Sequence, residues 1–485
     1  MKLEALFEGI PHEGALPDAE AALVTQDSRR VCPGAVFVCA RGKTSDGHDY
    51  IPKALAGGAV CIVTERPMGV PGEVRVQNGR KAYALLCANF FGRPAEKLRL
   101  AAVTGTNGKS TIAALVKQLL EQDGRKVGLM GTIRTEIDTM RIPAKYTTPE
   151  AWDLHALLAR MAAAGCTDAV MEASSQALDQ LRLWGLHFTV GAFTNLTQDH
   201  LDYHGTFENY FTAKKSLFDQ CDTMVTNLDD AYGRRLLTEG RAPHTVTISA
   251  HGEADWAARA VQLSASGARF RMKTPAGEFP VDFPMPGEYS VENALTAAAC
   301  AAALGMTPEN TARALSGCRG VRGRCEVLYH GDFTILCDFA HTGDAIENVL
   351  AGIAPFVEGR LLVLFGCAGQ RDAKKRPLMS EAVVKYADFA ILTSDNPRRE
   401  DPYAIIGDAE PVLKASGKPY ITEVERRCAL QKALNMLQKD DVLILCGKGH
   451  EDYQAVDGVT LYLDEHRIVR DWLAARGLRG QDAEM

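Results

Sequence analysis

Residues 101–111 place an apolar strand pattern, a glycine-rich turn and the start of a helix in immediate succession. Glycines in such a turn let main-chain N–H groups approach phosphates, while a following lysine neutralises them and a serine hydroxyl can ligate Mg²⁺. The usual G-x-x-x-x-G-K-[ST] spacing is one glycine short, because Val103 stands at its first position. The apolar strand before the turn and the amphipathic helix after it still supply the required context. We therefore predict a phosphate-binding loop, and with it ATP as a ligand, at Gly105, Thr106, Asn107, Gly108, Lys109, Ser110 and Thr111.

The 485 residues are enough for about three domains. The net charge of -7 lacks the basic excess of a nucleic-acid-binding protein. Thirteen cysteines without a C-x-x-C pair are typical of reduced, structural thiols. The first residues do not resemble an export signal, and no apolar run reaches the ~20 residues of a membrane span. We therefore expect a cytoplasmic protein, monomeric, that neither enters membranes nor binds nucleic acid.

The order of strand and helix patterns predicts an α/β fold of three domains, with boundaries at 1–97, 98–325 and 326–485. The first is a small α/β domain with strands at 35–39 and 59–63. The second is a mostly parallel, P-loop-like sheet with strands at 98–103, 169–172 and 192–195 and helices at 111–122, 152–164 and 290–303. After a Gly/Arg linker at 317–324, a Rossmann-like domain has strands at 334–338, 361–365, 389–393 and 442–446.

Polar residues follow two strands of the predicted central sheet, where ligands bind in open parallel sheets. Glu172 ends an apolar strand next to the loop, where its carboxylate could hold Mg²⁺ or cap a helix. Residues 197–205 contain two aspartates and two histidines just past another strand. A lone histidine is usually structural, but these neighbours favour a functional role for His200.

Helical spacing places Lys214 on one face with Tyr210, Leu217 and Phe218, whereas Lys215 points elsewhere. A desolvated lysine favours its neutral form, and a neutral amine can react with carbon dioxide to give a carbamate, which can ligate a metal. The alternative, favoured by the pattern alone, is a lysine whose stem packs while its ammonium reaches solvent.

Four strands of the third domain end in polar segments: 338–344, 365–372, 393–399 and 446–452. We expect these strand ends to meet at one edge of the sheet. Arg371, Arg398 and Glu451 could together bind a zwitterion, through guanidinium–carboxylate and ammonium–carboxylate pairs.

These motifs resemble those of the Mur ligase family, ATP-dependent amide-forming enzymes of cell-wall precursor synthesis. The resemblance runs along the whole chain, through segments 27–29, 105–110, 147–149, 172–175, 195–205, 213–214, 293–294, 323–324, 338–342, 375–377 and 447–451. Asp395-Asn396-Pro397-Arg398 is similar to the signature of members that add meso-diaminopimelate rather than lysine. The resemblance implies that meso-diaminopimelate is joined to UDP-N-acetylmuramoyl-L-alanyl-D-glutamate through an acyl phosphate, with ATP and Mg²⁺.

The resemblance also implies residue roles. Catalysis falls to Lys109, Glu172, His200 and Lys214, and the metal to Ser110, Glu172, His200 and Lys214 as its carbamate. Beyond the loop, nucleotide contacts are implied for Asn293, Arg324, Asp338 and His341. The UDP-sugar peptide is assigned to Ser28, Thr147, Thr148, Ser174, Gln180 and Arg182. Diaminopimelate is assigned to Arg371, Asp395, Asn396, Pro397, Arg398, Gly447 and Glu451.

Three positions depart from the family pattern: Gln176 replaces a common histidine, Gly343 a proline, and 367–370 a Gly-Gly-Asp loop. They affect the shape of the amino-acid pocket rather than the residues of catalysis. The alternatives are a sibling ligase that adds lysine or glutamylates a folate, a P-loop motor or switch on nucleic acid, and an inactive scaffold. Arg398 and segment 27–29 argue against the siblings, the acidic net charge against the motor, and the intact catalytic set against the scaffold.

Overall fold

The computed structural model describes residues 1–42, 45–264 and 266–480. Its internal contacts define two compact units, one formed by Met1–Ile248 with Ala299–Thr307, the other by Ser249–Ala298 with the chain from Pro308 onward. Each is described by itself below. The boundaries at 97/98 and 325/326 stay predictions.

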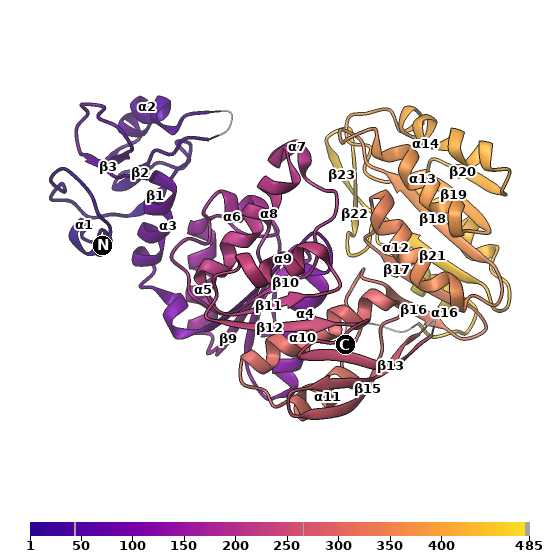
Figure 1. Cartoon of the computed structure of the whole chain (residues 1–485). Coiled ribbons are helices and arrows are strands. Elements are labelled where there is room, and N and C mark those ends of the chain that lie inside the picture. The colour runs from indigo at the N-terminus through magenta and orange to yellow at the C-terminus, as the bar shows by residue number, and fades with distance from the viewer. Residues whose placement is uncertain (43–44, 265, 481–485) are drawn as a thin grey trace. The chain divides into compact units, whose positions relative to one another are not determined.

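The first unit begins with a four-stranded, all-parallel sheet in the order β1-β2-β3-β4 (Figure 1). Its strands are β1 (Leu23–Thr25), β2 (Ala35–Val38), β3 (Ala59–Thr64) and β4 (Glu73–Arg75). The helices of this part are α1 (Leu3–Leu6), α2 (Ile51–Ala56) and α3 (Gly79–Phe90), with 3₁₀ turns at Gly47–Tyr50 and Pro94–Lys97. Every residue of β2 is buried, as expected for a parallel strand covered on both faces.

The rest of this unit is built on neighbouring strands in the order β12-β11-β10-β5-β9-β6-β7-β8. Those from β12 to β6 are parallel, and β7 and β8 continue antiparallel. The parallel strands are β5 (Arg99–Thr104), β6 (Val127–Met130), β9 (Asp168–Glu172), β10 (Phe188–Phe193), β11 (Cys221–Asn227) and β12 (His244–Ser249). The antiparallel ones are β7 (Arg134–Ile137) and β8 (Met140–Pro143). The loop-bearing strand β5 thus lies in the middle of the sheet, between β9 and β10.

Helices alternate with these strands, as the sequence predicts. They are α4 (Lys109–Gln122), α5 (Ala151–Ala163), α6 (Ser175–Asp179), α7 (Leu201–His204), α8 (Phe207–Lys215) and α9 (Ala231–Glu239), with a 3₁₀ turn at Ser216–Gln220. The buried side chains of α4 recur at helical spacing, at Ile112, Leu115, Val116, Leu119 and Leu120. They anchor α4 with its first turn at the carboxyl end of β5.

The second unit contains an antiparallel meander, most of helix α10, helix α11 and a six-stranded sheet. The meander is β13 (Trp256–Ser264), β14 (Gly267–Thr274) and β15 (Gly277–Phe283), followed by α10 (Glu288–Ala303) and α11 (Pro308–Ser316). The six-stranded sheet has the order β16-β17-β21-β18-β19-β20, parallel except for β16. Its strands are β16 (Glu326–His330), β17 (Thr334–Asp338), β18 (Leu361–Cys367), β19 (Phe389–Ser394), β20 (Tyr420–Glu423) and β21 (Val442–Cys446).

Helices cover both faces of this sheet (Figure 1). They are α12 (Gly343–Ile353), α13 (Lys375–Tyr386), α14 (Pro402–Ser416), α15 (Arg426–Asn435) and α16 (Glu465–Ala474), with a 3₁₀ turn at Ala354–Phe356 and a hairpin of β22 (Tyr453–Val456) and β23 (Val459–Tyr462). Along β18, Val363 and Phe365 join one apolar cluster, whereas Leu362 and Leu364 join the other. Successive side chains of a strand point to opposite faces, so one strand serves two cores.

The predicted α/β class with a mostly parallel central sheet is confirmed. The predicted strands at 334–338 and 442–446 match β17 and β21 residue for residue. The strand predicted at 192–195 is wrong at its end, because β10 stops at Phe193 and the next residues turn to hold the loop. Within 1–42, 45–264 and 266–480, no helix combines the length and apolarity that crossing a membrane would need.

Candidate functional site

The glycine-rich loop is held in shape by the residues that follow the neighbouring strand β10. Thr106 N–H donates to Asn195 O at 2.9 Å, and Asn107 N–H donates to Asn195 Oδ1 at 2.9 Å. Thr194 Oγ1 donates to Asn107 O at 2.6 Å, and a Cβ added to Gly105 would lie 1.8 Å from that same hydroxyl oxygen. The loop therefore needs glycine at this position. Its closing residue, Gly108, leads into α4, whose first turn contains the buried Ser110 and Thr111.

Two lysines converge on the main chain of this loop. Lys109 Nζ donates to the carbonyl oxygens of Gly105 and Thr106, at 2.9 and 2.8 Å. Lys214 Nζ donates to the same Gly105 carbonyl at 2.6 Å and lies 4.4 Å from the ring centre of Tyr210. Lys214 is only 1% exposed, so its ammonium does not reach solvent as the pattern alone had favoured. Burial, together with the charge of Lys109, holds the pKa of Lys214 well below its ordinary range.

Glu172 stands at the carboxyl end of β9, next to β5, and is 2% exposed. Thr132 clamps both of its oxygens: the main-chain N–H donates to Oε1 at 2.7 Å and the hydroxyl donates to Oε2 at 3.0 Å. Glu172 does not cap the following helix, because the N-cap residue of α6 is Ser174. The strand-end position expected for this carboxylate is therefore observed, and Thr132 adds an orientation that the motif did not indicate.

His200 precedes α7 in the left-handed region, at φ 52°. Its Nε2 lies 3.4 Å from Asp199 Oδ2, and about half of the side chain is exposed. Burial lowers the pKa of His200, and the charges of Lys109 and Lys214 lower it further against the opposing effect of Asp199. A neutral imidazole is the form that ligates a metal. We call the set of Gly105–Thr111, Glu172, His200 and Lys214 the loop site.

Five of the six residues assigned to the peptide substrate lie together. Thr148 Oγ1 donates to Glu172 O at 2.7 Å and accepts from Ser174 N–H at 3.0 Å. Arg182 donates to Thr148 O at 2.9 Å and to Gln180 Oε1 at 2.7 Å. Thr147 is connected to the group through Thr132, because the hydroxyl oxygens of the two residues lie 3.0 Å apart. Ser28 belongs to the N-terminal sheet, in the turn after β1.

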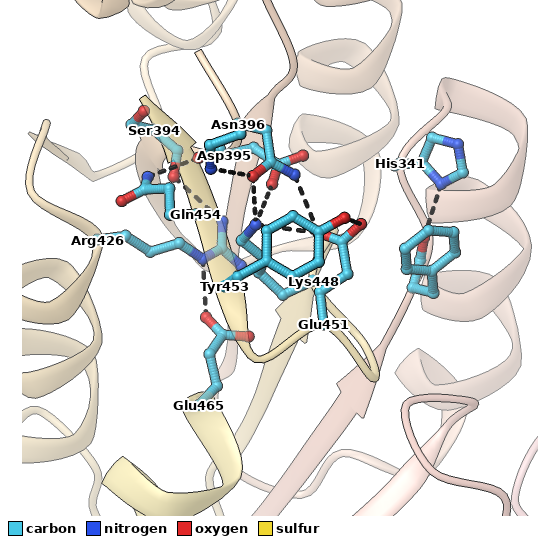
Figure 2. Close-up of polar contacts among 12 residues, drawn as sticks. His341, Ser394, Asp395, Asn396, Arg426, Lys448, Glu451, Tyr453, Gln454 and Glu465 are labelled. Carbon is cyan, nitrogen blue, oxygen red and sulfur yellow. Dashed lines mark hydrogen bonds and ion pairs between the residues drawn. The ribbon is translucent and has the colours of Figure 1, made fainter. Parts of the chain in front are cut away.

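In the second unit, the buried carboxylate of Asp338 ends β17. It accepts from Cys325 N–H at 2.6 Å and from Ala340 N–H at 2.7 Å. Burial raises the pKa of Asp338, against the charge of Arg324. Arg324 lies over the ring of Phe339. The exposed His341 contacts Phe339 O through Nδ1 at 2.8 Å (Figure 2). Three of the four further nucleotide residues thus gather at this strand end; the fourth, Asn293, lies on α10.

The ends of β19 and β21 meet in a group that we call the Lys448 cluster: Asp395, Asn396, Lys448 and Glu451 (Figure 2). Lys448 is fully buried, and its Nζ donates to Asn396 Oδ1 at 2.8 Å and to Glu451 Oε2 at 3.0 Å. Asp395 Oδ1 lies 3.2 Å from the same Nζ. Asn396 Nδ2 donates to Glu451 Oε2 at 2.9 Å, which closes a ring of contacts.

The remaining residues assigned to the amino acid surround this cluster at three strand ends. Gly447, at φ 108°, donates its N–H to Asp338 O at 3.0 Å. Pro397 precedes Arg398, which donates to Gly369 O at 2.7 Å and so ties its loop to the one after β18. Arg371 lies on that second loop, exposed, and donates to Gln370 O at 3.3 Å. The strand ends expected to meet do so, although Arg371 does not contact the cluster among the described residues.

The loop site suits a nucleotide and its magnesium on structural grounds. The only side chain that fits at Gly105 is a hydrogen, and α4 presents its N-terminus to the loop, where main-chain N–H groups and the helix dipole favour phosphate. Ser110 and Glu172 supply oxygen ligands, the type that Mg²⁺ prefers. Ser110, Glu172, His200 and a carbamylated Lys214 would hold the metal.

Sequence reasoning missed several residues that shape these sites. Thr132, Thr194 and Asn195 act through contacts with residues 40 to 88 positions away. Lys448 was part of a quoted motif, but received no role. The signal that could have found them is their place: each follows a buried strand whose neighbour already carried a predicted site residue.

A glycine-rich loop at a helix N-terminus, beside a buried carboxylate and a buried lysine, defines an ATP-dependent α/β enzyme. Models of the Mur ligase family match most of the chain: the middle domain at residues 103–301, the glutamate ligase domain at 323–449 and the family's catalytic domain at 20–87. The chain belongs to the Mur ligase family.

Similar proteins share this assignment. A UDP-N-acetylmuramoyl-L-alanyl-D-glutamate--2,6-diaminopimelate ligase of Clostridium acetobutylicum is 40% identical over 98% of this chain and 99% of its own length. One of Geobacillus kaustophilus is 40% identical over 98% and 100%. A solved structure of a ligase of that name matches with a TM-score of 0.70 and 33% identity, over 94% of this chain and 95% of that one. The ADP complex of a MurF ligase from Thermotoga maritima, with a TM-score of 0.61, 20% identity and coverage of 88% and 94%, shows the fold alone.

Proposed function

We propose that this chain adds meso-diaminopimelate to UDP-N-acetylmuramoyl-L-alanyl-D-glutamate at the expense of ATP. The observation that carries the proposal is the joint presence of two sites: a loop site with two converging lysines, and a charged cluster formed by Asp395-Asn396 and Glu451. The names of relatives that match over nearly the full chain support this substrate pair.

The chemistry needs an activated acyl group, because a carboxylate has no adequate leaving group. The γ-carboxylate of the D-glutamate attacks the γ-phosphorus of ATP, and the bond from that phosphorus to the bridging oxygen breaks, which releases ADP. The amine of diaminopimelate then attacks the acyl carbon, loses a proton and displaces phosphate. Such transfers depend mainly on positioning and on neutralising charge.

In the loop site, Lys109 would neutralise the phosphate group in transfer. Its Nζ donates to two carbonyl oxygens of the loop, which holds it beside the proposed phosphate position. Magnesium bound by Ser110, Glu172 and His200 would screen the phosphate charges from the attacking carboxylate. Thr132 holds Glu172 with both oxygens bonded, so that its orientation does not depend on the metal.

Lys214 fits a role as a carbamate. Burial and the charge of Lys109 favour its neutral amine, the form that reacts with carbon dioxide. The carbamate would place a negative charge beside the positive charge of Lys109. It would also supply an oxygen ligand to the metal.

Substrate binding divides between the two units. Thr147, Thr148, Ser174, Gln180 and Arg182 form a bonded group beside Glu172 and are proposed to hold the peptide, with Ser28 on the UDP-sugar. The nucleotide is further assigned to Asn293, Arg324, Asp338 and His341. Diaminopimelate is assigned to Arg371, Asp395, Asn396, Pro397, Arg398, Gly447 and Glu451. Domains at 1–97, 98–325 and 326–485, a monomeric state and a cytoplasmic location belong to the same proposal.

Phosphate release from ATP by the purified protein tests this function. The assay contains UDP-N-acetylmuramoyl-L-alanyl-D-glutamate with either meso-diaminopimelate or L-lysine, and the product mass is measured. Release with diaminopimelate and a product heavier by one diaminopimelate residue is expected. Preference for lysine would mean that the chain is the sibling ligase that adds lysine. Absence of product with both amino acids would overturn the proposed function.

A further inference from the structure

We propose that Lys448 is a positioning residue for the amino-acid substrate: its buried ammonium fixes the amide of Asn396 and the carboxylate of Glu451 in the orientation that receives the amino acid. The inference rests on the proposed function, because it takes the Lys448 cluster as the amino-acid site. It assigns a role to a residue that the motifs left without one.

The orientation of the Asn396 amide follows from its donors. Its Oδ1 accepts from Lys448 Nζ at 2.8 Å and from Ala455 N–H at 2.9 Å, which uses both lone pairs of an amide oxygen. A flipped amide would point its NH₂ group at these two donors. Nδ2 therefore faces Glu451, and only one of its two hydrogens is used within the described chain. The second hydrogen can donate to a substrate carboxylate.

The two oxygens of Glu451 are held unequally. Oε2 accepts from both Lys448 Nζ and Asn396 Nδ2, at 3.0 and 2.9 Å. Oε1 accepts only the longer bond from the Tyr453 hydroxyl, at 3.3 Å, among the contacts of the described residues (Figure 2). Lys448 thus engages one oxygen and leaves the other as the better acceptor for a substrate ammonium.

Charge gives a second reason for a lysine at this position. Asp395 and Glu451 both lie within 3.2 Å of Lys448 Nζ, so without the ammonium two carboxylates would share a mostly buried pocket. Like charges that close together oppose ionisation. With the ammonium, the cluster retains one net negative charge, which complements the ammonium of an amino acid.

The substitution Lys448→Met tests this, since it keeps most of the side-chain length and removes the N–H donors and the charge. We expect the KM for meso-diaminopimelate to rise by about tenfold or more, because a charged hydrogen-bond partner is lost from a buried site. The KM values for ATP and the UDP-sugar peptide should change less than about twofold. Added methylammonium or ethylammonium should partly restore Lys448→Ala, because a small cation can enter the space left by the side chain.

Arg360→Met is the matched control. Arg360 pairs with the 2%-exposed carboxylate of Asp441 at 2.6 Å, at the opposite end of β18 and β21. Its loss should lower stability without changing the KM for diaminopimelate. An equal rise of all three KM values in Lys448→Met, or the same diaminopimelate effect in Arg360→Met, would reduce Lys448 to a structural role and overturn the inference.

A second variant keeps the test decisive if the Lys448 variants do not fold. Ala455→Pro removes the other donor to Asn396 Oδ1 and leaves the ammonium in place. It should raise the same KM about threefold or more, and an unchanged KM would refute the orienting role of these donors. Absence of ligation in the wild-type protein, by contrast, would refute the proposed function itself.

Discussion

In the loop site, two lysines donate to main-chain carbonyl oxygens, whereas in the C-terminal sheet Lys448 contacts two carboxylates. A carbonyl orients an ammonium but does not neutralise its charge, and a carboxylate does both. The loop site combines Lys109 with the N-terminus of α4, an arrangement that favours a phosphate group. The Lys448 cluster has two carboxylates around one ammonium, keeps one net negative charge and suits the ammonium of an amino acid. Two buried-lysine sites in one chain are thus prepared for ligands of different charge.

The strongest test of this comparison is the removal of Lys109. We expect Lys109→Ala to lower ATP-dependent turnover by about a thousandfold or more, because no other loop side chain supplies charge to the transferring phosphate. Thermal stability should change little. Lys126→Ala, a surface lysine paired with Asp138 at 2.8 Å, is the control. Retention of activity in Lys109→Ala would contradict the assignment of the loop site.

The variant Lys214→Ala tests whether Lys214 acts as a carbamate or as an ammonium. Turnover should fall by about a hundredfold or more, and formate or acetate should recover part of it by replacing the carbamate oxygens. Lys215→Ala is the control on the same helix, since Lys215 pairs with Glu239 at 2.8 Å and lies outside the site. A variant that stays inactive at every carboxylate concentration, while methylammonium restores it, would instead favour the ammonium.

The sequence predicted these two regions to different depths. The loop site lies largely in one contiguous motif, and the apolar spacing around Lys214 placed that residue on the inner face. The pattern alone favoured an ammonium that reaches solvent, which is wrong, because Lys214 Nζ instead donates to Gly105 O, 109 positions away. Lys448 was harder to interpret, because a lysine between two glycines is typical of an exposed turn. It is buried because the ends of β19 and β21 meet, which brings it to Asn396, 52 positions away. Strand cores were predictable from apolar runs, but contacts between strand ends were not.

Thr132→Val tests whether orientation matters as much as charge in the loop site. The substitution keeps shape but removes the hydroxyl that donates to Glu172 Oε2 at 3.0 Å. Loss of one hydrogen bond to a buried carboxylate should lower kcat by roughly tenfold. Thr132→Ser should behave like the wild type, because it restores the donor. Equal kcat values for Val and Ser variants would show that the main-chain N–H alone orients Glu172.

The smallest effect on activity, and the clearest on stability, is expected from His466. This residue supports the C-terminal sheet, with Nε2 2.7 Å from Glu326 Oε2 and Nδ1 3.6 Å from Asp464 Oδ1. Burial alone would lower its pKa, but the nearby carboxylates of Asp464 and Glu326 outweigh burial and raise the pKa of His466 to about 9. Pairing of a basic side chain with carboxylates thus occurs at His466 as well as in the Lys448 cluster.

The sign of the pH dependence follows from that shift. A histidine whose pKa is raised on folding contributes its full stability below its unfolded pKa of about 6.5 and loses it as the pH rises through about 9. His466→Gln should therefore cost up to about 3 kcal/mol at pH 6, and the difference from the wild type should shrink toward pH 10. Urea unfolding at several pH values measures both curves. A difference that stays constant over this range would mean that His466 is neutral in the folded protein and that its contacts with Glu326 and Asp464 are not ion pairs.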